Sequence, residues 1–330
     1  MITANLPRGF TMRYPTMADL EEVTALTRTC EVALDGVAET TLDDIHTGWR
    51  MPSFDLAKDA WLVLSDEGKI VGLAGVEHRG HARIYTGGEV HPDYRNRGIG
   101  TYLLHLAEER ARQHIPQAPP EARVTLNCGA NSKDEAVIRL LEERGFTRVR
   151  YFWRMAIEMD AVPPAPELAE GITLRTFTPE MARAVYEADE EAFQDHWGYM
   201  PLPFEEWKHW TLMREGFDPT LWFLAMDGDE IAGFSLCKDE KESGGWVHVL
   251  GVRRPWRRKG VGLALLHHSF GGFYKRGIRN VYLGVDAQSL TGATRLYERA
   301  GMHVIRQYNT YEKELRAGKE LSTQFIEGEG

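Results

Sequence analysis

Arg257-Arg258-Lys259-Gly260-Val261-Gly262-Leu263 is the most informative stretch of this 330-residue chain. Before it, residues 246–252 form an apolar run that predicts a strand, and after it residues 264–270 have the apolar spacing of an amphipathic helix. A strand, a basic glycine turn and a helix in this order present free backbone N–H groups to a phosphate. The two glycines let the backbone approach such an anion because no Cβ stands in the way. Five of the seven residues from Arg253 to Lys259 are basic, which suits a ligand with several phosphates.

The spacing of these glycines excludes two other phosphate loops. The Walker loop needs a glycine, four residues and then Gly-Lys-Ser/Thr, and the dinucleotide fingerprint needs three glycines, whereas this turn has two. The remaining pattern is Arg-x-x-Gly-x-Gly after a strand that ends in Leu-x-Val. Taken alone, a pattern this short is explained equally well by a basic turn before a solvated helix.

A second copy of the pattern lies in the first half of the chain. Residues 89–101 have the same order of strand end, arginine, two residues and Gly-x-Gly, and Arg95 precedes Arg257 by 162 positions. Farther on, residues 141–146 (Leu-Glu-Glu-Arg-Gly-Phe) match residues 297–302 (Tyr-Glu-Arg-Ala-Gly-Met) at an offset of 156 positions. Two markers that recur in one order at nearly one offset indicate a duplicated domain.

The duplicated loop resembles the acyl-coenzyme A pyrophosphate loop of the GNAT N-acetyltransferase superfamily. The resemblance covers nearly all of both halves, and the chain is similar to tandem GNAT proteins of the mycothiol-synthase-like kind. It implies acetyl-CoA as the cofactor. It also implies two sets of cofactor-binding residues: Leu250, Val252, Arg257, Arg258, Lys259, Gly260, Val261, Gly262, Leu263 and Ser289 in the second half, and Arg95, Arg97, Gly98 and Gly100 in the first. Ser289 stands where the family commonly has an asparagine.

Composition limits the classes of protein to which the chain can belong. It is 43% hydrophobic and 27% charged, no apolar run approaches the ~20 residues that span a bilayer, and the N-terminus lacks the apolar core of a signal peptide. The net charge of −10 disfavours binding to nucleic acid. Three scattered cysteines (Cys30, Cys128 and Cys237) predict neither a disulfide framework nor a metal site. We therefore expect a cytoplasmic protein without metal, nucleic-acid or membrane partners, whose oligomeric state the sequence leaves open.

The order of predicted elements gives the domain organisation. In each half, strand, helices, hairpin, strand, helix, strand, helix and strand follow one another, which predicts an α/β fold with a mixed sheet and helices on its faces, as the resemblance to GNAT domains implies. Residues 161–170 contain three prolines and form the predicted linker. We expect an N-terminal GNAT-like domain at 1–160, a catalytic GNAT domain at 171–317 and a flexible tail at 318–330.

Tyr297 is the residue that the resemblance singles out for chemistry. GNAT proteins typically carry a tyrosine in the pattern Ala-x-x-x-Tyr-x-x-x-Gly-Phe, where it donates a proton or a hydrogen bond to the departing thiolate. Residues 293–302 keep this pattern with methionine in place of phenylalanine. The alternative is that Tyr297 is simply part of an apolar helix face. The matching residue in the first half is Leu141, which cannot donate a proton, so we expect catalysis in the second half.

His248 is the candidate general base. An alkylamine with a pKa near ~10 must lose a proton before it can attack, and a neutral imidazole can accept that proton. Period-2 alternation predicts that His248 lies on the same face of its strand as Leu250 and Val252, and some GNAT amine acetyltransferases have a histidine at this place. A hydrogen-bonded core histidine is the alternative. Mycothiol synthases tend to have a glutamate where this chain has Trp246, which argues against their substrate.

The segment 191–207 is the candidate acceptor site. In GNAT folds this region usually lines it, and aromatic side chains here alternate with carboxylates that could hold a cation. The candidate residues are Glu191, Asp195 and Trp197. An aromatic surface that docks against the first half is the alternative.

These observations predict an acetyl-CoA-dependent N-acetyltransferase. It would move the acetyl group to a primary amine of a small molecule or peptide by direct attack in a ternary complex. One rival is a non-catalytic acyl-CoA-binding sensor or interaction protein that kept the fold. Another places the chemistry in the first half, with water as the proton carrier.

Overall fold

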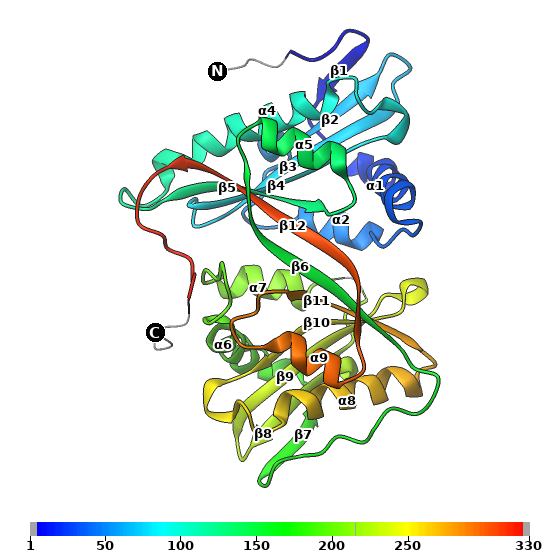
Figure 1. Ribbon diagram of the computed structural model, residues 1–330, viewed down its shortest axis with the longest axis vertical. Coiled ribbons are helices and arrows are strands. Elements are labelled where there is room, and N and C mark those ends of the chain that lie inside the picture. Colours follow the sequence, from blue (N-terminus) through cyan, green and yellow to red (C-terminus); the bar gives the residue numbers. More distant parts are fainter. Residues whose placement is uncertain (1–4, 215, 326–330) are drawn as a thin grey trace. The chain divides into compact units, whose positions relative to one another are not determined.

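The computed structural model describes residues 5–214 and 216–325, and its chain divides into two compact units (Figure 1). The first unit comprises the residues up to Arg150 together with Asn309–Leu321. The second comprises Tyr151–Tyr308 and the residues from Ser322 onward. Within the described ranges, no helix is long and apolar enough to cross a membrane.

The first unit is built on a mixed sheet in the order β1-β2-β3-β4-β5-β12. Strands β1 to β4 pair antiparallel, and β4 and β5 pair parallel. The strands are β1 (Phe10–Arg13), β2 (Ala60–Ser65), β3 (Ile70–Arg79), β4 (Arg83–Val90), β5 (Val124–Asn131) and part of β12 (His303–Arg316). The helices are α1 (Leu20–Asp35), α2 (Leu42–Trp49), α3 (Leu56–Asp59), α4 (Ile99–His114) and α5 (Glu135–Glu143).

The second unit repeats this arrangement, with strand order β6-β11-β10-β9-β8-β7. Strands β7 to β10 pair antiparallel, and β10 and β11 pair parallel. The strands are β6 (Thr147–Glu158), β7 (Ile172–Thr176), β8 (Trp222–Asp227), β9 (Glu230–Asp239), β10 (Gly245–Val252) and β11 (Asn280–Asp286). The helices are α6 (Ala182–Phe193), α7 (Phe204–Thr211), α8 (Val261–Lys275) and α9 (Ala293–Arg299). The predicted mixed α/β fold is confirmed.

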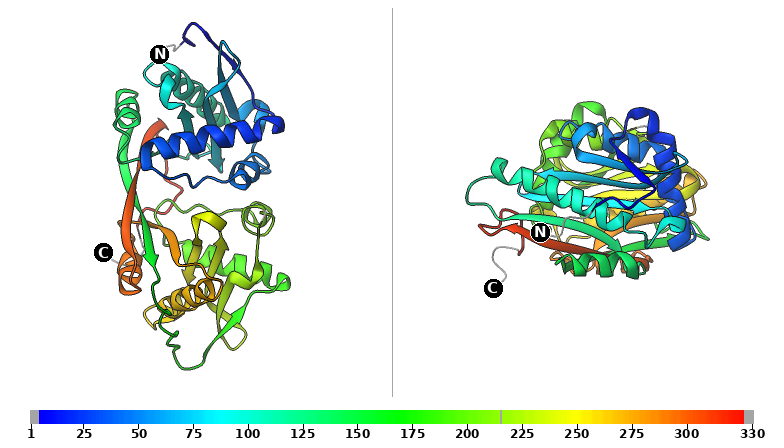
Figure 2. Two further views of the ribbon diagram at one scale, coloured as in Figure 1. Left: turned by 90° about the vertical axis from the view of Figure 1, so that its right-hand side faces the viewer. Right: turned by 90° about the horizontal axis from the view of Figure 1, so that it is seen from above.

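Helices cover both faces of each sheet because alternate strand residues point to opposite faces. In the first unit, helices α1 and α4 lie on the two faces of the sheet (Figure 2). A Cβ at Gly72 would lie 2.9 Å from Ile99 at the start of α4, whereas Leu73 packs in the core beneath α1. In the second unit, Phe234 is fully buried in the core formed with α6 and α7, and Ser235 bonds Ser269 of α8 at 2.8 Å.

The two units exchange their last strands. Strand β6 follows α5 of the first unit, but residues 152–158 pair antiparallel with β11, and Met155 is buried in the core of the second unit. Strand β12 follows α9, but its residues 309–316 belong to the first unit, where Tyr311 is buried. The compact units therefore differ from the expected ranges 1–160 and 171–317. The pattern of a strand shows that it is half-buried but does not show which sheet it joins.

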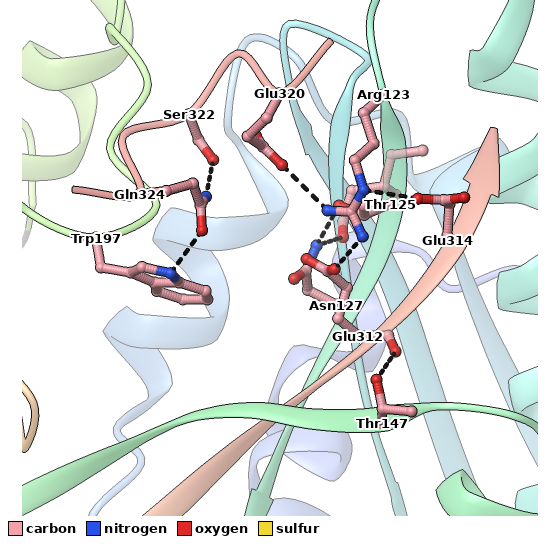
Figure 3. A network of polar contacts seen from close by, with 11 residues as sticks. Arg123, Thr125, Asn127, Thr147, Trp197, Glu312, Glu314, Glu320, Ser322 and Gln324 are labelled. Atoms are coloured by element: carbon pink, nitrogen blue, oxygen red, sulfur yellow. Dashed lines mark hydrogen bonds and ion pairs between the residues drawn. The ribbon is translucent and has the colours of Figure 1, made fainter. Parts of the chain in front are cut away.

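Residues 318–325, the first part of the tail that we expected to be flexible, make defined contacts in the structure. Lys319 exchanges backbone hydrogen bonds with Glu121 and Arg123, at 2.6 and 2.8 Å. The guanidinium of Arg123 then bonds three carboxylates within the first unit, those of Glu312, Glu314 and Glu320 (Figure 3). Residues 326–330 lie outside the described part of the chain.

Candidate active site

The two glycine loops have the same backbone conformation. Asn96 and Arg258 both lie in the left-handed region, with φ of 60° and 63°. Gly98 and Gly260 follow with φ of 84° and 81°, and each is the residue immediately before a helix, α4 or α8. A turn with left-handed residues at every second position can direct backbone N–H groups toward one concave point, which favours an anion. The two loops therefore repeat in backbone conformation as well as in sequence.

The second glycine of each loop makes room for a neighbouring helix. A Cβ at Gly262 would lie 3.1 Å from Leu296 of α9, and one at Gly100 would lie 3.4 Å from Leu140 of α5. The first helix after each loop thus packs closely on the helix that carries position 297 or 141. Gly100 and Gly262 act through packing, in addition to any approach to a phosphate.

The arginine of each motif closes its own loop. The Nε of Arg257 donates to the carbonyl of Val252 at 3.1 Å, and its Nη2 donates to the carbonyl of Ala192 at 3.1 Å. Arg95 makes the corresponding bond to Val90 at 3.5 Å and pairs with Asp134 at 3.1 Å. These bonds hold the strand end against the loop, and the cofactor-binding role expected of both arginines stays a prediction.

Carboxylates at the end of α6 neutralise much of the basic stretch. Asp195, whose side chain is 3% exposed, bonds both Arg254 and Arg257, and Arg253 bonds Glu191 at 2.6 Å. The hydrogen bond from Arg254, then that from Arg257, lowers the pKa of Asp195 to about 2 despite its burial. The geometry therefore disfavours Glu191 and Asp195 as acceptor ligands, a role that stays a prediction. On the loop itself, Arg258 and Lys259 are exposed.

Asp195→Asn should lower the free energy of unfolding by about 2–3 kcal/mol, because two arginines lose their buried anionic partner. The measurement is a urea unfolding midpoint at neutral pH. The carboxylate's pKa is about 2 in the folded chain, below its ordinary ~3.9. Its contribution is therefore complete above pH ~4 and disappears as pH falls through about 2. Glu187→Gln is the control, since Glu187 and Arg183 are both exposed on the same helix. Equal midpoints in all three proteins would show that the Asp195 pairs do not stabilise the loop.

Each sheet opens directly before its glycine loop. Strands β10 and β11 pair through Gly245 and Trp246, whereas residues 247–252 have no partner on β11. In the first unit, β4 and β5 pair over residues 83–86, whereas residues 87–90 pair with β3 but have no partner on β5. Parallel strands that separate in this way expose backbone N–H and C=O groups to an extended ligand, because such groups need a partner. Each opening leads from the centre of the sheet to the loop.

His248 lies at a β-bulge of β10, where the register shifts between Val247 and Val249. The bulge breaks the alternation, so Val247, Leu250 and Val252 all contribute to the core beneath α8. The bulge removes the simple alternation from which the shared face of His248, Leu250 and Val252 was predicted, and that shared face stays a prediction. Its Nε2 lies 3.1 Å from Oε1 of Glu240.

Glu240 and His248 form a pair that sequence analysis missed. Burial lowers the pKa of His248, while the hydrogen bond to Glu240 partly offsets that effect. Burial alone would raise the pKa of Glu240, but the bond from His248 and the ammonium of Lys238, 3.1 Å away, hold it at about 2. A neutral imidazole beside a carboxylate is an arrangement that can accept a proton and stabilise the resulting cation. The glutamate lies in the β9–β10 connection, eight residues before the histidine, and no sequence pattern links them.

Tyr297 lies in α9 and is 7% exposed. It belongs to the same core cluster as Leu250, Val252 and Leu263. Burial raises the pKa of its hydroxyl to about 12, and no described residue forms a hydrogen bond with it. The hydroxyl is therefore protonated throughout the physiological range and available to a ligand. In the first unit, Leu141 is buried at the corresponding place.

The remaining predicted residues have local roles. Ser289 caps the start of α9, because its Oγ accepts from the backbone N–H groups of Thr291 and Ala293 at 3.3 Å. Val261 is buried within α8. The Nη2 of Arg97 donates to the carbonyl of Asp93 at 3.0 Å. Trp197 donates to Oε1 of Gln324 at 2.8 Å, which ties the segment after α6 to the chain end (Figure 3).

The first unit contains a cavity of about 540 Å³ between the opened strands, the glycine loop and α5. Its lining includes Gly87, Gly88, Glu89, Arg95 and Cys128. Burial raises the pKa of Glu89 to about 7, against the opposing effects of Cys30 and Arg95. Sequence analysis missed this carboxyl because its counterpart in the repeat is Gly251; an acidic residue in an apolar strand end was the available signal.

The three cysteines are free thiols. Burial raises the thiol pKa to about 12 for Cys30 and Cys128 and to about 11 for Cys237. A thiol must ionise to act as a nucleophile, so none of the three is suited to covalent catalysis at neutral pH.

Both halves of the chain match the acetyltransferase (GNAT) family, over residues 21–148 and 182–302. A mycothiol acetyltransferase of Geodermatophilus obscurus is 32% identical over 259 residues, which are 73% of this chain and 77% of that protein. Another from Actinosynnema mirum is 29% identical over 291 residues, 85% of this chain and 91% of that protein.

Two solved structures match both halves of the chain. A GCN5-related N-acetyltransferase from Sphaerobacter thermophilus is 41% identical with a TM-score of 0.81, and the match covers 97% of this chain and 100% of that one. A tandem GNAT protein from the clavulanic acid biosynthesis pathway has the same fold, with a TM-score of 0.73 at 17% identity over 94% of this chain and 100% of that one.

Proposed function

The chain belongs to the acetyltransferase (GNAT) family, and on that premise we propose that its second unit carries out the transfer. The protein is an acetyl-CoA-dependent N-acetyltransferase with two GNAT domains. The observation that carries the assignment to the second unit is the Tyr297 hydroxyl, which is buried, protonated and without a partner among the described residues. The first unit has Leu141 at that place and cannot supply such a donor.

The loop from Arg258 to Gly262 would hold the pyrophosphate of the cofactor. Its left-handed residues present backbone N–H groups, and the exposed Lys259 adds a positive charge. The opening between β10 and β11 offers unpaired backbone groups to the extended arm of the cofactor. Backbone N–H groups of β10 in the same opening would stabilise the negative charge on the carbonyl oxygen during attack.

Acetyl-CoA supplies a thioester, whose carbonyl carbon forms a bond to the amine nitrogen as the carbon–sulfur bond breaks. His248 would accept the proton that the amine loses, and Glu240 is the positioning residue that holds the imidazole. Tyr297 would donate a hydrogen bond to the departing sulfur. Because the pKa of Tyr297 is about 12 and that of a thiol is ~8.5, this hydrogen bond stabilises the thiolate without full proton transfer.

His248→Ala should lower kcat/KM at least about tenfold at neutral pH and remove the acidic limb of its pH profile. The base acts when it is neutral, so the rate rises as pH rises through the pKa of His248, which lies below its usual 6.5. Glu240→Gln removes the charge that raises this pKa, and should move the limb to lower pH. The measurement is initial rate against pH for the three proteins. A profile unchanged in His248→Ala would return His248 to a purely structural role.

The acceptor that we propose is a primary amine on a small molecule. The relatives reported above are named mycothiol acetyltransferases, which favours a small molecule over a peptide. Trp246 stands at the position where the mycothiol-synthase-like proteins tend to have a glutamate, and the guanidinium of Arg154 lies 4.3 Å from its ring centroid. A guanidinium at this position favours an acceptor whose structure near the amine differs from that of the substrate of the mycothiol-synthase-like proteins. The free cysteines accord with a cytoplasmic location, which we also propose.

A panel of small amines, amino sugars and peptide N-termini, read as release of free thiol from acetyl-CoA, tests the function. Turnover is expected with at least one small amine. Binding of acetyl-CoA without turnover of any amine would favour the sensor instead.

The first unit is a second candidate site for acyl-CoA. Its cavity of about 540 Å³ has the same loop and strand opening, and Glu89 offers a carboxyl with a pKa of about 7. That value suits a general base near neutral pH. We propose that this unit holds cofactor and makes little contribution to turnover, because it lacks the tyrosine.

A further inference from the structure

Three histidines of the first unit converge away from the glycine loop. His78 is near the end of β3, His81 lies in the turn to β4, and His114 is the last residue of α4. One ring nitrogen from each lies within 4.8 Å of the other two. The Nδ1 atoms of His81 and His114 are 2.8 Å apart, and the rings of His78 and His81 stack with centroids 4.0 Å apart.

At least one ring nitrogen of this histidine cluster has no hydrogen-bond partner among the described residues. The contact between His81 and His114 uses one nitrogen of each ring, and the Nε2 of the buried His114 has no partner among the described residues. A buried polar nitrogen without a partner is costly, so it usually indicates an unseen water or other group on that side of the ring, and the nitrogen that His114 directs at His81 is its Nδ1. His78 and His81 are half-buried, which gives solvent access to the cluster.

The imidazoles keep their lone pairs at neutral pH. Burial lowers the pKa of His78 and His114 to about 4, and burial also lowers that of His81. Asp59 acts in the opposite direction on the first two, but its carboxylate already accepts from Arg110 at 2.6 Å and from the backbone of Asp55 at 2.7 Å. Neutral imidazoles without a competing acid partner are the protonation state that a metal ion requires.

We propose that His78, His81 and His114 form a binding site for a divalent transition metal ion of the zinc class. Imidazole nitrogens suit Zn²⁺, Co²⁺, Ni²⁺ and Cu²⁺, whereas Mg²⁺ and Ca²⁺ prefer oxygen ligands. Around tetrahedral Zn²⁺ with Zn–N bonds of about 2.0–2.1 Å, ligand nitrogens are roughly 3.3 Å apart. The Nδ1 atoms of His81 and His114 are 2.8 Å apart, and one nitrogen from each of the three rings lies within 4.8 Å of the others, so these separations bracket that value. Water completes the fourth position.

The position of the site determines what the ion does. It joins the β3–β4 turn to the last residue of α4, whereas the glycine loop precedes the first residue of that helix. Sixteen residues of α-helix span roughly 24 Å. The ion therefore stabilises the first unit at a distance from its cavity, and acetyl transfer does not depend on it. The signal in the sequence was His-x-x-His at residues 78–81; the third ligand was invisible because it lies 33 positions farther on.

The test uses the full chain without a polyhistidine tag, stripped with a chelator and dialysed. Zn²⁺ is titrated calorimetrically, and Co²⁺ is followed by its visible absorption. We expect one ion per chain and a higher Tm with the ion bound. His81→Asn should weaken binding at least about tenfold by removing one ligand, and asparagine tolerates the φ of 56° at this position. His78→Gln should do the same.

The control is His105→Gln, which removes a half-buried histidine of the same helix that is not part of the cluster. It should bind the ion as the wild-type chain does. Three results would overturn the proposal: no stoichiometric binding by the wild type, wild-type affinity in His81→Asn, or equal loss in His105→Gln. Circular dichroism of each variant shows that it is folded, and unchanged thiol release after chelation is expected.

Discussion

Replacing Gly260 by glutamate should lower acetyl transfer at least about 100-fold, through lost affinity for acetyl-CoA. The new carboxylate would lie in the loop of the second unit, where we propose that backbone N–H groups bind the pyrophosphate, and would repel it. Glutamate also strains the φ of 81°, although no other atom lies within 4 Å of the new Cβ. Initial rates of thiol release at saturating amine measure the effect.

Two variants separate charge from strain and one unit from the other. Gly260→Asn introduces a neutral side chain that tolerates the left-handed region, and should keep most of the activity. Gly98→Glu makes the same charge change in the first unit, at a φ of 84°, and should leave turnover within about twofold of the wild type. If Gly98→Glu lost activity and Gly260→Glu kept it, the transfer would belong to the first unit.

Tyr297→Phe should lower kcat at least about tenfold and change the affinity for acetyl-CoA little, because the lost hydrogen bond forms only as the thiolate departs. No described residue bonds the hydroxyl, so the substitution removes no hydrogen bond within the described chain. Steady-state rates and calorimetric binding of acetyl-CoA are the two measurements. The signature is a fall in kcat at constant affinity.

Tyr274→Phe is the matched control, since Tyr274 lies on α8 and packs against the same core as Tyr297. Its activity should remain at the wild-type level. Full activity in Tyr297→Phe would remove this residue from the mechanism and leave water as the donor to the sulfur.

The repeat made the fold predictable. The two loops share their left-handed residues, Asn96 with Arg258 and Gly98 with Gly260, as the offset of 162 positions implied. Family membership, the mixed sheet and acetyl-CoA as cofactor are confirmed. The exchange of β6 and β12 was not predictable, because a half-buried strand has the same pattern in either sheet.

Charge partners were the least predictable part of the site. The sequence shows five basic residues near the loop, but not that Arg253, Arg254 and Arg257 are bonded to Glu191 and Asp195. Such pairs are long-range, and composition contains no information about them. The bulge at His248 is a similar case, since one extra residue shifts the face on which each later side chain lies.

Calorimetric titration of the Gly98→Glu variant with acetyl-CoA measures cofactor binding by the second unit, because the substitution blocks the glycine loop of the first. The assignment made here predicts one site per chain with the affinity of the wild-type second unit, and thiol release that continues when an amine is added. Absence of binding in this variant, with a folded chain, would contradict it, because the cofactor site would then lie in the first unit.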